Sequence, residues 1–247
     1  MLALPVHIHA CLFDLDGVLT QTSKVHPAAW KERFDGHLLE RATRGGKAYV
    51  PFDAVGDYDE YVDGRPRADG VRTFFGARGV PLPEGSPEDP PEAETVNGLG
   101  NRKNELVLRR IREEGVEDYD GSVRYVNAVR AAGLRCAVVS SSANTRDVLR
   151  AAGIEDLFDE RTDGVVARER RLRGKPAPDT YLEAARGLGT DPGAAAVFAD
   201  ALAGVEAGRA GRFGVVVGVD RVGQAEQLRA HGADVVVRDL ADLLEER

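Results

Sequence analysis

Two acidic residues follow the first apolar run of the chain at a spacing that suits metal and phosphoryl chemistry. Asp14 and Asp16 are separated by one residue, and Gly17 directly after them permits a sharp turn. Two neighbouring carboxylates repel each other unless they share a cation or a proton. Because Mg²⁺ prefers oxygen ligands of this kind, the pair predicts a magnesium site.

Three further segments bring a hydroxyl, an ammonium group and another acid to comparable positions. Ser140, followed by Ser141 and Ser142, offers hydroxyl and backbone N–H groups to an anion. Lys175 precedes a proline-stiffened helix start, and Asp200 ends an apolar run. Taken singly, such residues are usually solvated or cap a helix. In this order, and each after a strand, they predict a site that handles phosphoryl groups.

The elements that must position these residues follow a strand–helix rhythm. Nearly continuous apolar runs are typical of strands buried on both faces, and they alternate with amphipathic helical stretches. The predicted strands cover 9–14, 134–140, 195–200, 213–219 and 233–237, and the predicted helices between them cover 122–132, 145–152, 180–188 and 221–231. Right-handed crossovers between such strands form a parallel sheet. The fold class is therefore α/β, with a doubly wound (Rossmann-like) parallel sheet whose reactive residues lie at the carboxyl ends of the strands.

One region breaks this rhythm. Residues 23–117 contain no clear buried strand but show helical stretches at 27–41, 69–78 and 102–114, with a proline-rich loop at 81–91. This pattern predicts an inserted α-helical cap domain. The predicted domains are an α/β core formed by 1–22 and 118–247, and a helical cap formed by 23–117.

Composition limits the class of protein and its partners. The chain has 247 residues, a net charge of −8 and 43% hydrophobic residues, which predicts a globular protein. The negative charge argues against nucleic acid or an anionic membrane as partner, and the short basic run 168–175 is interpreted as a solvated surface arm. Cys11 and Cys136, both in apolar runs, fit a reducing cytoplasm. We therefore expect a cytoplasmic protein; its oligomeric state stays open, and a monomer is plausible.

These four segments resemble the motifs of the haloacid dehalogenase superfamily, in the subgroup with a helical cap after the first motif. The resemblance implies that Asp14 is the nucleophile and that Asp16 is the general acid and base. It implies that Ser140 binds the phosphoryl oxygens and that Lys175 neutralises charge. It also implies Mg²⁺ as cofactor, held by the Asp14 side chain, the Asp16 carbonyl and Asp200.

The cap resembles that of the β-phosphoglucomutase-like subfamily. The residues that carry this likeness lie in the segments TQTSKVHPAAW and GNRKN. The implied substrate-binding residues are Thr22, His26, Trp30, Arg67, Lys103, Asn104, Ser141 and Ser142. Arg65 competes with Arg67 for the distal phosphate, and residues 36–63 together with the proline-rich loop lengthen the cap relative to the short form of the family.

Ala199 departs from this subfamily, whose members carry a Glu-Asp pair where this chain has Ala199-Asp200. Three functions remain open. The first is a mutase that interconverts a sugar 1-phosphate and 6-phosphate through an aspartyl-phosphate. The second is a sugar-phosphate phosphatase, and the third is a non-catalytic sugar-phosphate-binding protein with an impaired metal site. A phosphorylated sugar is the expected small-molecule partner in each case.

Overall fold

The computed structural model describes residues 2–45 and 48–244, which divide into two compact units. Among the described residues, one unit comprises 2–21 and 116–244, and the other comprises 22–45 and 48–115. These limits lie one or two residues from the predicted ones. We call the first unit the core and the second the cap, and each is described by itself.

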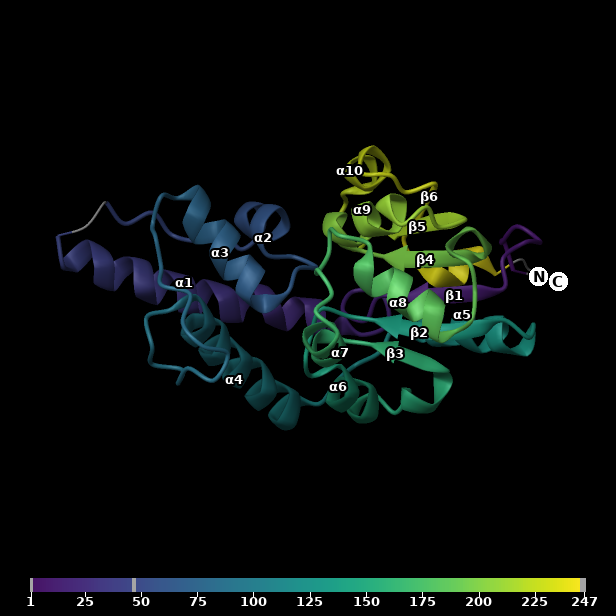
Figure 1. The fold of residues 1–247 in the computed structure, drawn as a ribbon, viewed down its shortest axis with the longest axis horizontal. Coiled ribbons are helices and arrows are strands. Elements are labelled where there is room, and N and C mark those ends of the chain that lie inside the picture. Colours follow the sequence, from purple (N-terminus) through teal and green to yellow (C-terminus); the bar gives the residue numbers. More distant parts are fainter. Residues whose placement is uncertain (1, 46–47, 245–247) are drawn as a thin grey trace. The chain divides into compact units, whose positions relative to one another are not determined.

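The described part of the core contains a six-stranded sheet in which every strand pairs in parallel. Its strands are β1 (Ala10–Phe13), β2 (Arg135–Val139), β3 (Glu160–Thr162), β4 (Ala195–Ala199), β5 (Val215–Val219) and β6 (Val235–Val237). Their order is β3-β2-β1-β4-β5-β6 (Figure 1). This is the doubly wound order, whose ligand crevice lies at the point where the strand order reverses, between β1 and β4. The predicted fold class is confirmed, although the short strand β3 was missing from the prediction.

Helices pack on the sheet so that its central strands are buried. These helices are α5 (Asp120–Ala131), α6 (Thr145–Ala151), α7 (Gly164–Glu169), α8 (Asp179–Gly187), α9 (Leu202–Ala210) and α10 (Ala225–Ala230). Short 3₁₀ turns add η2 (Glu155–Leu157), η3 (Pro192–Ala194) and η4 (Leu240–Leu243), and η1 (Gln21–Lys24) begins at the last core residue before the cap. Residues of α8, α9 and α10 share one apolar cluster with the sheet. Tyr125 of α5 meets Phe13, which stacks on Phe198 of the neighbouring strand with the ring centroids 4.6 Å apart.

The described part of the cap is helical, as the sequence predicts. Its helices are α1 (Val25–Thr43), α2 (Gly56–Tyr61), α3 (Arg67–Ala77) and α4 (Val96–Glu114). An aromatic cluster holds them together, in which Phe34 of α1 stacks on Phe74 of α3 at 4.5 Å between ring centroids. The prediction began α4 six residues too late and did not include α2. The cap therefore has an apolar core of its own.

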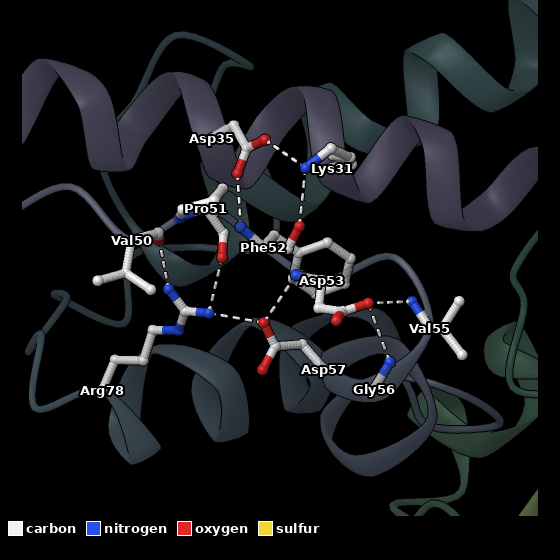
Figure 2. A network of polar contacts seen from close by, with 10 residues as sticks. All are labelled: Lys31, Asp35, Val50, Pro51, Phe52, Asp53, Val55, Gly56, Asp57 and Arg78. Atoms are coloured by element: carbon white, nitrogen blue, oxygen red, sulfur yellow. Dashed lines mark hydrogen bonds and ion pairs between the residues drawn. The ribbon is translucent and has the colours of Figure 1, made fainter.

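The long connection between α1 and α2 is held by charged groups rather than by burial alone. Figure 2 shows Asp35 of α1 accepting a hydrogen bond from the Phe52 N–H at 2.6 Å, while Lys31 donates to the Phe52 carbonyl at 2.8 Å. Arg78, after α3, donates to the Pro51 carbonyl at 3.0 Å and pairs with Asp57 at 2.6 Å. Ionic hydrogen bonds from α1, from α2 and from the end of α3 thus fix this connection.

Two sequence expectations concern the cysteines and membranes. Cys11 and Cys136 are free, fully buried and opposite each other on β1 and β2. Burial raises the pKa of both thiols, that of Cys136 to about 12, so both stay protonated at neutral pH. Among the described residues, none of the helices has the length and apolar character of a membrane span.

Candidate active site

The two acids predicted to share a cation lie at the carboxyl ends of neighbouring strands. β1 pairs with β4 so that Phe13 is opposite Phe198, and the Asp14 N–H donates to the Phe198 carbonyl at 2.9 Å. Asp14 therefore leaves β1 beside the end of β4, where Asp200 follows. This is the reversal point of the strand order, at which open α/β sheets bind their ligands.

Asp14 and Lys175 form a buried ion pair. Lys175 Nζ lies 2.6 Å from Asp14 Oδ2 and 3.1 Å from the Val139 carbonyl oxygen, and the two charged residues are only 2% and 5% exposed. The Leu15 N–H donates to the second carboxylate oxygen, Oδ1, at 2.9 Å. Both oxygens of Asp14 are thus oriented by fixed donors.

Two opposing effects set the pKa of Asp14. Burial raises this pKa above its usual value, and the nearby Asp16 raises it further. The charge and hydrogen bond of Lys175 lower it. The net direction is upward, so Lys175 is the protein group that does most to keep this buried carboxylate ionised.

The segment before α8 anchors Lys175. Arg173 pairs with Asp179, the first residue of α8, at 2.8 Å, and its backbone N–H donates to the same carboxylate at 3.1 Å. Within the predicted surface arm, Arg173 is exposed, whereas Lys175 is buried. The basic run therefore ends in the candidate site.

Tyr181 was not among the sequence-predicted site residues. Its ring centroid lies 4.8 Å from Lys175 Nζ, and its buried hydroxyl has no hydrogen-bond partner among the described residues. Burial raises the pKa of Tyr181 well above its usual value, and Asp14 and Asp200 raise it further. The phenol therefore stays protonated beside these acids. Its place on the inner face of the predicted helix 180–188 was the available signal, but that position is typical of ordinary core packing.

Ser140 follows β2 and is 2% exposed. Its backbone N–H donates to the Thr162 carbonyl at 3.1 Å, and its hydroxyl oxygen accepts the Ser142 N–H at 3.1 Å. The Ser142 hydroxyl in turn accepts the Asn144 N–H at 3.1 Å. The hydroxyl of Ser140 is therefore oriented by its own loop, with its proton to donate to an anion.

The residues around Asp14 fit Mg²⁺ through a mixed set of ligands. Among residues 2–45 and 48–244, no three His, Cys, Asp or Glu side chains form a metal-binding group. The predicted set needs only two carboxylates, because the third ligand is the Asp16 carbonyl. Asp200 packs against Gly17, the residue after Asp16, and both Asp14 and Asp200 raise the pKa of Tyr181. Two carboxylates and a carbonyl are hard oxygen donors, which suit Mg²⁺.

Ala199 closes β4 as a fully buried residue. It belongs to the apolar cluster that also contains Tyr181. A Cβ added at Gly204 would lie 2.8 Å from Ala199 Cβ, 3.5 Å from Asp14 Oδ2 and 3.7 Å from the Tyr181 hydroxyl oxygen. The end of β4 is therefore closely packed around Ala199.

Gly17 has a backbone that only glycine adopts without strain, with φ at +75°, and an added Cβ would overlap Asp200 Oδ2. We expect Gly17→Ala to displace Asp200 and to lower activity by about 100-fold, with a higher magnesium requirement. Steady-state rates over a magnesium titration measure both effects.

Gly189→Ala is the matched control for this substitution. Gly189 has φ at +65°, but an added Cβ meets nothing within 4 Å. Both variants carry the strain of a positive φ, roughly 1–2 kcal/mol. Equal activity of the two variants would contradict the prediction, because overlap of the added Cβ with Asp200 would then not lower activity.

Three predicted substrate-binding residues meet inside the cap. Lys103 Nζ of α4 lies 2.5 Å from His26 Nδ1 of α1 and 5.0 Å from the ring centroid of Trp30. Lys103 and Trp30 are 8% and 3% exposed. A cation over an indole ring and beside an imidazole is held in one orientation.

The other predicted cap residues are placed as follows. Arg67 opens α3 and lies against α4, since a Cβ added at Gly100 would lie 3.0 Å from its Cγ. Asn104 follows Lys103 on α4, and Thr22 is buried at the start of the cap. Arg65 precedes α3, and its N–H donates to the Val62 carbonyl at 3.2 Å. The catalytic and metal candidates thus belong to the core, with Ser141 and Ser142, and the sugar-binding candidates to the cap.

A doubly wound core with a buried aspartate–lysine pair and an inserted helical cap defines a class of phosphoryl-transfer proteins. Residues 8–212 match the haloacid dehalogenase-like hydrolase family. The chain belongs to this family and is an enzyme.

Within this family, the chain is similar to several β-phosphoglucomutases. The chain is 59% identical to a β-phosphoglucomutase of Mycobacterium tuberculosis, over 99% of this chain and 94% of the relative. It is 30% identical to the β-phosphoglucomutase of Bacillus subtilis, over 95% of this chain and 91% of the relative. The crystal structure of a β-phosphoglucomutase from Clostridium difficile is similar at a TM-score of 0.72 and 25% identity, covering 96% of this chain and 93% of the other.

Proposed function

We propose that this enzyme is a β-phosphoglucomutase-type phosphotransferase, which interconverts a hexose 1-phosphate and 6-phosphate through an aspartyl-phosphate on Asp14. The observation that carries the proposal is the 59% identity to a β-phosphoglucomutase along nearly the whole of both chains. The buried Asp14–Lys175 pair supports the same chemistry.

Asp14 is the nucleophile of the proposed reaction. One oxygen of its carboxylate attacks the phosphorus of the substrate, and the bond from phosphorus to the departing oxygen breaks. Lys175 and the Leu15 N–H orient the carboxylate, while Lys175 also offsets negative charge that gathers on the phosphoryl oxygens. A carboxylate nucleophile divides one difficult displacement into two easier ones.

Asp16 and Ser140 complete the core half of the proposal. Asp16 protonates the departing sugar oxygen and removes a proton from the hydroxyl that later attacks the aspartyl-phosphate. Ser140 donates its hydroxyl proton to a phosphoryl oxygen. Asp14, Asp200 and the Asp16 carbonyl would hold Mg²⁺, which would supply positive charge that the transition state needs.

The cap residues bind the sugar phosphate in this proposal. Lys103, held by His26 and Trp30, contributes a fixed positive charge, and Arg67 contributes a guanidinium suited to a second phosphate. Thr22 and Asn104 offer hydrogen bonds to sugar hydroxyls. Such positive charge is needed because the protein as a whole carries a net charge of −8.

Phosphorus NMR with β-glucose 1-phosphate, Mg²⁺ and a hexose bisphosphate primer tests the proposal. We expect the 6-phosphate signal to grow at the expense of the 1-phosphate, with little inorganic phosphate. Steady release of inorganic phosphate without 6-phosphate would identify a phosphatase instead. Binding without turnover, even at high Mg²⁺, would identify a sugar-phosphate-binding protein in which Ala199 impairs the metal site.

A further inference from the structure

Helix α1 carries three basic side chains, each with a buried nitrogen that has no hydrogen-bond partner among the described residues. Arg33, His37 and Arg41 are spaced four residues apart and therefore lie on one face of the helix. Arg33 is 9% exposed and His37 is 5% exposed. Arg33 Nε, His37 Nε2 and Arg41 Nε are all buried, and none bonds to any residue of the described chain.

Such an arrangement is unfavourable unless something accepts these hydrogen bonds. Burying a charged group without a partner costs several kcal/mol, and a guanidinium does not escape the cost by losing its proton under ordinary conditions. Arg102 of α4 adds another positive charge beside Arg33. Burial and these like charges lower the pKa of Arg33, and burial lowers that of His37.

The nearby acids are engaged elsewhere. Glu40 and Glu94 attract both Arg33 and His37 electrostatically. However, both glutamates form ion pairs with the exposed Arg44, at 3.7 and 3.1 Å. They therefore stand at the surface, and the inner face of α1 keeps an excess of positive charge.

Two neighbouring features shape this face. The His37 ring packs edge-to-face on Phe75 of α3, at 5.3 Å between ring centroids, so its orientation is constrained. Glu94, which acts electrostatically on His37, directly precedes Thr95, the residue that caps α4.

We propose that Arg33, His37, Arg41 and Arg102 form a binding site for a small oxyanion, a phosphate group, within the cap. Phosphate oxygens accept the hydrogen bonds that Arg33 Nε, His37 Nε2 and Arg41 Nε do not make within the described residues, and the exposed Arg102 adds positive charge that the anion neutralises. The group can come from inorganic phosphate or from a phosphorylated sugar. The proposal does not depend on the catalytic role of Asp14.

¹H–¹⁵N correlation NMR of the full-length, ¹⁵N-labelled protein tests this site directly. Inorganic phosphate is titrated at constant ionic strength, and the Arg33 Nε–H and His37 ring signals are followed. Arg33→Gln and His37→Gln assign these signals. We expect saturable shifts in the wild-type protein, and binding at least about tenfold weaker in Arg33→Gln, since the lost hydrogen bond joins two charged groups. Arg112→Gln, at an exposed position of α4, is expected to bind like wild type.

Thermal unfolding separates this site from phosphate binding in the core. Without phosphate, we expect Arg33→Met to melt at or above the wild-type temperature, because an unpaired buried cation has been removed. With phosphate, the wild type gains stability that Arg33→Met does not. If Arg33→Met does not fold, the same comparison is made with the less buried Arg41→Gln.

The outcomes are distinguishable. Arg33 and His37 signals that do not respond to phosphate, or equal phosphate stabilisation of wild type and variant, would overturn the proposal. A second titration with glucose 6-phosphate identifies the source, because a sugar phosphate that binds more tightly than inorganic phosphate adds contacts through the sugar. Loss of mutase activity in Asp14→Asn, with cap binding retained, would keep the two proposals separate.

Discussion

Replacing Asp14 by Asn is expected to lower turnover by at least about 10⁴-fold while the protein keeps its fold. The amide oxygen is not a nucleophile toward phosphorus. The amide has the shape of the carboxylate but only one oxygen, so it can accept from either Lys175 or the Leu15 N–H, which lie 2.6 and 2.9 Å from the two carboxylate oxygens, and not from both. The chemical step should therefore be lost with little change in local geometry.

Phosphorus NMR measures the loss, and circular dichroism checks the fold. Asp147→Asn, at an exposed position of α6, is the matched control and should leave the rate unchanged. Trapping provides an independent check: after an acid quench, wild-type protein should hold a phosphoryl group that hydroxylamine removes, as expected of an aspartyl-phosphate, and Asp14→Asn should not. Retained activity or a trapped phosphoprotein in Asp14→Asn would refute the assignment of the nucleophile.

The central sheet could be predicted because its strands are buried on both faces. The segment Ala10–Phe13 is fully buried and reads as a continuous apolar run. β3, by contrast, is three residues long, with two charged residues, Glu160 and Arg161, at the edge of the sheet. Its pairing with β2 depends on a tertiary contact that leaves no apolar pattern.

The start of α4 shows how packing overrides local preference. Gly98 and Gly100 disfavour a helix, and the sequence therefore predicts a start at residue 102. In the structure, the Thr95 side chain accepts the Gly98 N–H at 2.9 Å and caps the helix. Val96 and Leu99 are then buried in the cap cluster, which stabilises the additional turns.

Residues of the candidate site could be predicted where they directly follow a predicted strand or lie in a segment that resembles a family motif. Other residues of the site could not be predicted. Asp14 and Asp200 are brought together by the pairing of β1 with β4, which parallel-sheet topology implies. Tyr181 is different, because an aromatic residue on the inner face of a helix usually packs in a core. Its contact with Lys175 arises from the path of the chain before α8. Arg33 and His37 are likewise ordinary helix residues until their burial is known.

Replacing Lys175 by Met is expected to lower turnover by at least about 100-fold at neutral pH. Lys175 is the only residue of the described chain that forms an ion pair with Asp14, and the substitution removes its positive charge. Asp14 stays buried beside Asp16, so its pKa rises further above the usual value and less of the nucleophilic carboxylate is present. Arg173→Met, in the same segment but exposed, controls for changes in the loop.

The same substitution should change how stability depends on pH. An acid whose pKa is raised in the folded state binds its proton more tightly there than in the unfolded chain. Below the pKa of Asp14 in the unfolded chain, burial of this acid therefore does not lower the free energy of unfolding. As the pH rises from there toward the pKa of Asp14 in the folded protein, the free energy of unfolding falls. Lys175→Met should thus lose stability relative to wild type by roughly 3–5 kcal/mol at neutral pH, the usual cost of breaking a buried pair, and by less near pH 5.

Urea unfolding at several pH values, in the presence of a chelator, measures this difference without a bound divalent cation. A deficit that shrinks as the pH falls identifies Asp14 as the group left without its partner. A deficit that is constant with pH would instead mean that Lys175 stabilises the protein by packing against Tyr181 rather than by its charge. The double variant Lys175→Met with Asp14→Asn sharpens the comparison, because it removes both charges. If the ion pair is responsible, this variant should be more stable at neutral pH than Lys175→Met alone, although its turnover should be lower.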